Sequence, residues 1–118
     1  MILRFATAAV VLALGTLAVL ADPVGRYTST GTNPGGGAPW SGTVEVQRTG
    51  DTYRVTWNVG GTIFTGTGIG SRDFLAVSYR SGNQTGIALY GRQSDGTWQG
   101  VWTYAGSREI AEDRWNPR

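Results

Sequence analysis

The stretch that decides the fold is residues 52–62, which read TYRVTWNVGGT. Its first eight residues alternate between polar and apolar side chains, and the apolar ones are Tyr53, Val55, Trp57 and Val59. Alternation with a period of two places all four on one face of an extended strand. The following Gly60-Gly61 pair supplies the positive φ angles that a two-residue hairpin turn requires. The stretch therefore predicts an amphipathic strand that turns directly into a second one.

The same pattern extends over the chain from residue 22 onward, where no segment shows a helical period. Glycine-rich and polar turn signals interrupt the apolar alternation about every 8–12 residues, the spacing typical of all-β sandwiches and barrels. The predicted strands are residues 24–32, 39–48, 52–59, 62–69, 73–80, 85–92, 97–104 and 108–116.

Short connections predict that strands adjacent in sequence are antiparallel neighbours in space. A meander of this kind would leave two exposed edges unless it closed on itself. We therefore expect an all-β fold in which an eight-stranded antiparallel up-and-down meander closes into a small barrel. Glycines inside the predicted strands (Gly66, Gly68, Gly86 and Gly100) fit bends, or places where an aromatic ring lies over bare backbone.

Residues 1–21 have the pattern of a secretory signal peptide. Arg4 precedes an apolar run, and small residues at positions 19 and 21 fit a cleavage site before Asp22. We expect a signal helix over 1–21 and a single barrel domain over 22–118, exported to the periplasm or the extracellular space. A retained membrane anchor is the alternative, but no charged stop-transfer cluster follows the run, so no stable span is expected after cleavage.

Composition argues against an enzyme. The chain has no cysteine, histidine or lysine, so the usual nucleophile, general base and metal ligands are missing. We expect no catalytic residue, no metal and no cofactor. Without Arg4, nine arginines face eight acidic residues and are interleaved with them, which argues against nucleic-acid binding because that requires clustered cations.

Aromatic residues are the main candidates for both core and contact roles. Tyr53, Trp57 and Trp102 are predicted core members, since large rings supply the core of a small domain without disulfides. Three tryptophans near predicted strand ends, where a barrel mouth would lie, are the candidate ligand or partner contacts: Trp40, Trp98 and Trp115.

The one carboxylate cluster comprises Glu109, Glu112 and Asp113. We expect it to pair with Arg108 and Arg114 on a solvated surface rather than to act as a catalytic pair.

An ordered set of short motifs spans most of residues 22–118. It includes Gly31-Thr32-Asn33-Pro34, Trp40-Ser41-Gly42-Thr43-Val44, Gly50-Asp51-Thr52-Tyr53, Gly86-Ile87-Ala88-Leu89-Tyr90 and Trp98-Gln99-Gly100-Val101-Trp102. In this set the chain resembles small exported bacterial β-proteins labelled "fibronectin-binding protein". The resemblance implies a non-enzymatic extracytoplasmic domain that adheres to a host or matrix protein, and it assigns no contact residue.

A weaker likeness concerns the avidin and lipocalin barrels. The motif Trp98-Gln99-Gly100-Val101-Trp102 is similar to the aromatic-x-Gly-x-aromatic strand of avidins, and Trp115 falls roughly where a later ligand-facing tryptophan would lie. The polar residues that hold biotin are not matched, so this likeness implies architecture rather than biotin binding.

Together these features predict a secreted, non-enzymatic binding module that contacts a protein partner, fibronectin or another matrix protein, through loops and rim aromatics. Two alternatives stay open. One is a carrier of a small hydrophobic ligand that uses the barrel interior, and the other is an exported enzyme inhibitor.

Overall fold

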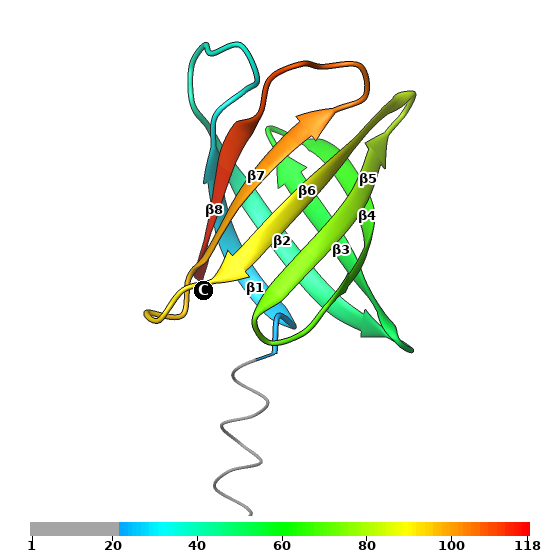
Figure 1. Cartoon of the computed structure of the whole chain (residues 1–118), viewed down its shortest axis with the longest axis vertical. Helices are drawn as coiled ribbons and strands as arrows, with labels where there is room; N and C mark the ends of the chain where they lie inside the picture. Colours follow the sequence, from blue (N-terminus) through cyan, green and yellow to red (C-terminus); the bar gives the residue numbers. More distant parts are fainter. Residues whose placement is uncertain (1–21) are drawn as a thin grey trace, which may run out of the picture.

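The computed structural model describes residues 22–118, which form eight β-strands and no helix (Figure 1). The strands are β1 (Gly25–Gly31), β2 (Trp40–Thr49), β3 (Thr52–Val59), β4 (Thr62–Gly70), β5 (Phe74–Ser81), β6 (Gln84–Arg92), β7 (Trp98–Tyr104) and β8 (Ala111–Pro117).

Every strand pairs antiparallel with its sequence neighbours, and β1 pairs with β8 to close the barrel. The closing ladder runs from Tyr27 opposite Pro117 to Gly31 opposite Asp113. The predicted all-β, eight-stranded up-and-down barrel is therefore confirmed. The largest boundary difference is at β8, which begins at Ala111 rather than at residue 108. There the Thr103 hydroxyl donates to the Glu109 carbonyl (2.7 Å), which holds the preceding residues in a loop.

The predicted signal helix over 1–21 lies outside the described residues. Between residues 22 and 118, no helix has the length and apolar character needed to cross a membrane.

The Gly60-Gly61 turn joins β3 to β4 as the sequence indicates. Both glycines have positive φ angles, +60° and +86°, and the flanking Val59 and Thr62 are directly paired. The Asn58 side chain also accepts a hydrogen bond from the Gly61 amide (3.1 Å). The backbone therefore reverses within two residues and fixes the register of this hairpin.

The two ends of the barrel differ in how they are filled. At the lower end in Figure 1, which we call the core end, the loops are residues 50–51, 71–73 and 93–97. Fully buried rings pack there around Trp115, whose ring centroid lies 4.1 Å from that of Tyr90 and 5.4 Å from that of Tyr27. Trp98 packs against the same indole at 6.5 Å. These rings belong to a hydrophobic core that also includes the valines of β2 and β3. Its other members are Tyr53, Trp57, Leu75, Val77, Tyr79 and Ala88.

Glycines on the inner face make room for these rings. A Cβ atom at Gly100 would overlap the Tyr90 ring, and one at Gly86 would overlap the Tyr79 phenol. Each glycine lies directly opposite that tyrosine on the paired strand. An aromatic ring therefore lies over the bare backbone at Gly86 and Gly100, as expected. At Gly66 and Gly68 the nearest side chains are instead those of Val77 and Leu75.

Candidate functional site

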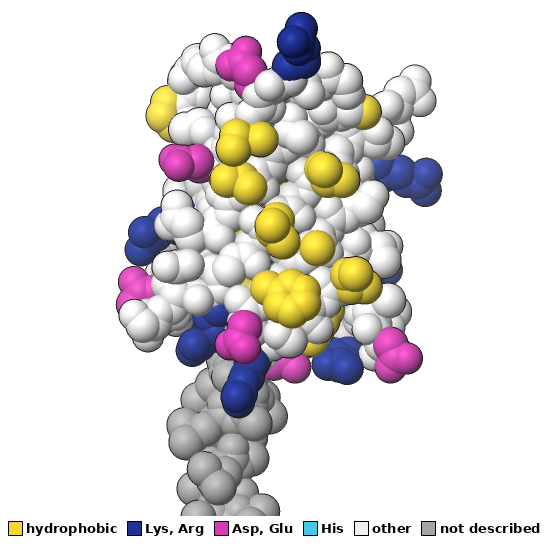
Figure 2. All heavy atoms as spheres, in the orientation of Figure 1, with side chains coloured by type: hydrophobic (Ala, Val, Ile, Leu, Met, Phe, Trp, Pro, Cys, Tyr) yellow, Lys and Arg dark blue, Asp and Glu magenta, His cyan; other side chains and the backbone are white. Residues whose placement is uncertain are grey.

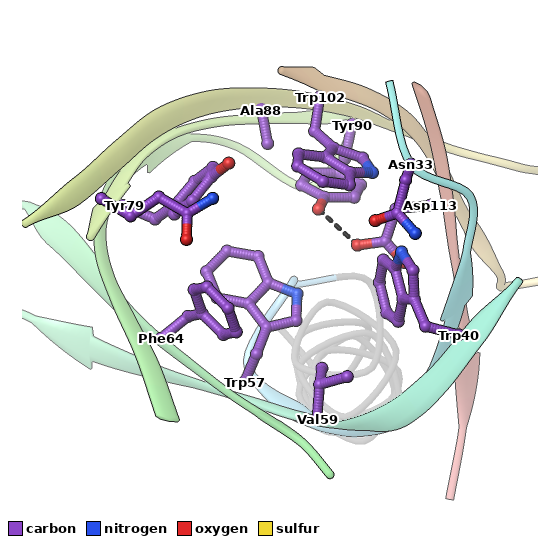
Figure 3. Close-up of a pocket in the computed structure, with 11 residues that line it drawn as sticks. Asn33, Trp40, Trp57, Val59, Phe64, Tyr79, Ala88, Tyr90, Trp102 and Asp113 are labelled. Atoms are coloured by element: carbon purple, nitrogen blue, oxygen red, sulfur yellow. Dashed lines mark hydrogen bonds between the residues drawn. The ribbon is translucent and has the colours of Figure 1, made fainter. Parts of the chain in front are cut away.

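The opposite end of the barrel, which we call the cavity end, is hollow. It carries the loops 32–39, 60–61, 82–83 and 105–110 and opens into a cavity of about 220 Å³ (Figure 3). The lining residues are Asn33, Trp40, Trp57, Val59, Phe64, Tyr79, Gln84, Ala88, Tyr90, Trp102 and Asp113. Six of these eleven side chains are aromatic, so the cavity has a mainly apolar wall.

Two indoles at the rim are held by a single backbone carbonyl. The Nε1–H groups of Trp40 and Trp102 both donate to the Thr32 carbonyl oxygen, at 3.0 and 3.1 Å. Thr32 is itself tied to β8, because its amide donates to the Glu112 carbonyl and its hydroxyl accepts from the Glu112 amide. The start of the β1–β2 loop therefore fixes both rings at the rim, where their centroids lie 6.3 Å apart in an edge-to-face arrangement.

Further rings line the middle of the wall on strands β3, β4 and β5. The ring centroid of Tyr79 lies 5.9 Å from that of Trp57 and 6.1 Å from that of Phe64, both in edge-to-face contact. The Tyr79 hydroxyl donates to the Thr103 carbonyl (3.2 Å), which anchors the phenol to β7 over Gly86 of the intervening strand β6. Aromatic pairs in this edge-to-face geometry stabilise one another by about 0.5–1.5 kcal/mol beyond the burial of their surface.

The floor of the cavity carries the carboxylate of Asp113, which is only 2% exposed. Its Oδ1 accepts from the Ser29 hydroxyl (2.7 Å), and its Oδ2 accepts from the Tyr90 hydroxyl (2.6 Å) and the Trp115 indole (3.0 Å). Strands β1, β6 and β8 thus contribute to one buried cluster between the core and the cavity. Among the described residues, every buried side-chain polar atom has a hydrogen-bond partner.

Burial and hydrogen bonding act in opposite directions on the pKa of Asp113. Burial raises the pKa of this carboxyl above its ordinary value, and hydrogen bonding from Tyr90, Ser29, Trp115 and Trp57 lowers it again, with burial the larger effect. Burial and the adjacent carboxylate also raise the pKa of Tyr90 well above its ordinary value, so this phenol remains a hydrogen-bond donor at neutral pH. The floor is therefore a hydrogen-bonded acid with neutral donors around it.

The three tryptophans expected at a barrel mouth are divided between the two ends. Trp40 lines the cavity, whereas Trp98 and Trp115 are 1% and 0% exposed and belong to the core. These two do not lie at the open mouth, because Trp98 begins β7 and Trp115 lies near the end of β8, both at the filled end. Of the predicted core members, Tyr53 and Trp57 are buried, and Trp102 is partly buried in the cavity wall.

Sequence reasoning missed Asp113. It was expected on a solvated surface with Arg108 and Arg114, but it points inward, while Arg114 lies 3.6 Å from Asp95. The alternation along β8 carried the signal, since Asp113 shares its face with Ala111 and Trp115. An acid on the apolar face of a strand is unusual and marks a buried polar site.

The lining of the cavity offers apolar and polar groups that can contact a ligand. Across residues 22–118, no group of three or more acidic residues lies close enough together to hold a metal ion. The aromatic wall can enclose a small organic molecule, and the Asp113 carboxyl can accept a hydrogen bond from it or balance a positive charge.

A second surface feature lies on the outer wall of the barrel. Leu89 and Val101 are paired neighbours on β6 and β7, and with Ile69, Phe74 and Ile87 they form what we call the outer patch. Their exposed fractions range from 37% to 62%. Figure 2 shows hydrophobic side chains gathered on this face, over the strands that Figure 1 labels β5, β6 and β7. Several exposed apolar side chains gathered on one face are a feature of interaction sites.

Comparison with known proteins adds no relative: no family model, no curated protein and no solved structure matches the chain. What the protein does is therefore inferred from the chemistry of the cavity and of the outer patch.

Proposed function

We propose that this protein is a non-enzymatic binding barrel that holds one small, largely apolar ligand at its cavity end. The observation that carries the proposal is the hollow half of the barrel, a cavity of about 220 Å³ surrounded by aromatic side chains. An eight-stranded barrel is just wide enough to be filled by side chains or to hold one small ligand. Here side chains fill the core end, and the cavity end has room for a ligand.

The volume sets the size of the ligand. The cavity is larger than the roughly 150 Å³ of an engineered protein cavity that binds benzene, and smaller than the roughly 300–1,000 Å³ of sites for drug-sized molecules. A single aromatic ring with a short substituent fits this range. Burial of its apolar surface against the rings of the wall provides the driving force.

Ala88 offers a direct test, because its small side chain lies on the cavity wall. Native mass spectrometry and tryptophan fluorescence would measure binding of a library of small aromatic and cofactor-like molecules. We expect saturable binding at a ratio of one to one, and its loss in Ala88→Phe, where the added ring fills the cavity. Ala76→Phe is the matched control, since Ala76 lies on the outward-facing side of β5. The proposal would be contradicted if no member of the library bound, or if Ala88→Phe bound as well as the unchanged protein.

Contact with a protein partner is a second candidate function, favoured by the outer patch. We propose that the patch, rather than the rim, makes this contact, since Trp40 and Trp102 use their indole N–H groups within the protein. The resemblance to exported fibronectin-binding proteins makes fibronectin the first partner to test and supports the proposal of a location outside the cytoplasm.

Immobilised fibronectin titrated with the 22–118 domain would measure this contact. Leu89→Glu should abolish saturable binding, because Leu89 lies within the outer patch. Gln47→Glu adds the same charge at an exposed position on β2 and should leave binding unchanged. No saturable signal with the unchanged protein would eliminate fibronectin as the partner.

A further inference from the structure

The cavity combines two features that favour the same kind of ligand, an aromatic wall and one buried acid. The wall includes the rings of Trp40, Trp57, Phe64, Tyr79 and Trp102. The face of an aromatic ring carries negative charge density, and cations are attracted to it, most strongly when water is excluded. Several rings around one small volume therefore favour a positively charged group more than any single ring does.

Asp113 is the one formally charged residue in the lining of this cavity, and no arginine accompanies it there. Its three hydrogen-bond donors, Ser29, Tyr90 and Trp115, are all neutral. In residues 22–118 the recorded ion pairs involve other acids, namely Glu45, Asp22 and Asp95. The negative charge of a buried Asp113 carboxylate thus has hydrogen bonds but no counter-charge from the described part of the chain.

Three hydrogen bonds of 2.6–3.0 Å reach this carboxylate, and the Trp57 side chain on the cavity wall is a fourth donor that acts on it. All four donors are neutral, so the carboxylate is hydrogen-bonded but its charge is not balanced. An uncharged apolar ligand would cover this carboxylate without compensating it, which costs free energy. An anionic ligand would meet repulsion from both the carboxylate and the ring faces. A cation is attracted by both.

We propose that the ligand of this cavity is a small organic cation, of the alkylammonium or quaternary ammonium class, held between the aromatic wall and the carboxylate of Asp113. The inference rests on the proposed small-ligand function and names the ligand class for that site. Burial raises the pKa of Asp113, and a cation next to the carboxylate would stabilise its charged form and offset this effect.

The decisive comparison uses two molecules of nearly the same shape, choline and its carbon analogue neohexyl alcohol. In the alcohol a carbon atom replaces the ammonium nitrogen, so the pair differs chiefly in charge. Isothermal titration calorimetry with the 22–118 domain would measure both affinities. We expect choline to bind at least about tenfold more tightly, the ratio that corresponds to a moderate cation–π and charge contribution.

Three variants assign the preference to its sources. Asp113→Asn removes the charge and should reduce choline affinity about tenfold. The affinity for the alcohol should stay the same or rise, because no uncompensated carboxylate is then covered. Phe64→Leu keeps an apolar side chain but removes a ring, and should lower choline affinity several-fold. Glu112→Gln is the matched control, because Glu112 lies on the same strand as Asp113 with its side chain outward. It should change neither affinity.

The outcomes separate this inference from the proposed function. Equal or tighter binding of neohexyl alcohol overturns the cation inference, yet it supports a small-ligand site. Binding of neither molecule also overturns the cation inference, and the wider library with Ala88→Phe then decides the proposed function. Retention of the choline preference in Asp113→Asn would show that the carboxylate does not hold the charge. The comparison of the two ligands needs no variant, so it stands even if a substitution impairs folding.

Discussion

Replacing Asp113 with asparagine or with leucine tests whether the floor of the cavity is held together by hydrogen bonds or by charge. The asparagine amide can take the place of the carboxylate with little rearrangement. Its oxygen can accept from Tyr90 and Trp115, and its nitrogen can donate to the Ser29 hydroxyl, whose oxygen is also an acceptor. Leucine has a similar size but offers no acceptor to any of the three donors.

The expected magnitudes differ widely. Each buried donor that loses its acceptor costs about 1–3 kcal/mol, so three of them would cost about 3–9 kcal/mol. The two hydroxyl groups can rotate toward other acceptors, so we expect Asp113→Leu to lose about 3–6 kcal/mol of unfolding free energy. A domain of this size is stable by about 5–15 kcal/mol, so the leucine variant should be severely destabilised. Asp113→Asn keeps the contacts and should remain within about 1 kcal/mol of the unchanged protein at pH 7.

The pH dependence of the free energy of unfolding tests the same residue in a second way. Burial raises the pKa of Asp113 in the folded state, so the unfolded chain releases this proton first as the pH rises above about 4. The free energy of unfolding of the unchanged protein should therefore fall, relative to that of Asp113→Asn, until the pH exceeds the folded pKa. The other titrating groups are common to both proteins, and their contributions cancel in the difference.

Urea unfolding followed by tryptophan fluorescence at a series of pH values would measure these free energies. The reasoning would be refuted by an asparagine variant as unstable as the leucine variant at pH 7. It would also be refuted if the stability of the unchanged protein rose with pH relative to Asp113→Asn.

Two further predictions concern the inner face. Gly100→Ala should destabilise the barrel by about 1–3 kcal/mol, because the new Cβ atom would overlap the Tyr90 ring. Gly91→Ala, where the nearest atom would lie 3.9 Å away, should be neutral or slightly stabilising in the same urea assay, and equal losses would contradict the packing argument. Burial raises the pKa of Tyr79 to about 12, so an alkaline absorbance titration should show a phenol ionising near that pH. This step should be absent in Tyr79→Phe, with circular dichroism confirming that both proteins are still folded, and an unchanged titration curve would refute the assignment.

The barrel could be predicted from the sequence because its determinants are local. Alternation in segments such as residues 52–59 defines an inner face. A two-glycine turn is so short that the next strand must pair directly with the one before it. Closure could be predicted because no other segment is available to cover the two edges of a meander of short-linked strands. Each of these inferences uses residues within about ten positions of one another.

The location of the site could not be predicted in this way. Strand directions alternate in a meander, so the start of β2 must lie at the end opposite to the start of β7 and the finish of β8. This places Trp40 apart from Trp98 and Trp115, but it does not say which end is filled. That depends on how side chains from strands distant in sequence share the interior, as where Trp115 of β8 packs against Tyr27, Trp57 and Tyr90.

Asp113 lies on the boundary between the filled and the hollow halves, and this position couples stability to binding. Its donors Tyr90 and Trp115 are core residues, while its carboxyl lies against the cavity. A ligand that compensates the carboxylate binds the folded state alone, since the unfolded chain has no cavity. Binding must then raise the unfolding free energy by mass action, by about 2.7 kcal/mol at a ligand concentration one hundred times the dissociation constant. If Asp113 is the point of contact, the pH dependence of stability that this residue causes should diminish when the cavity is occupied by a cation and persist when it is occupied by a neutral molecule.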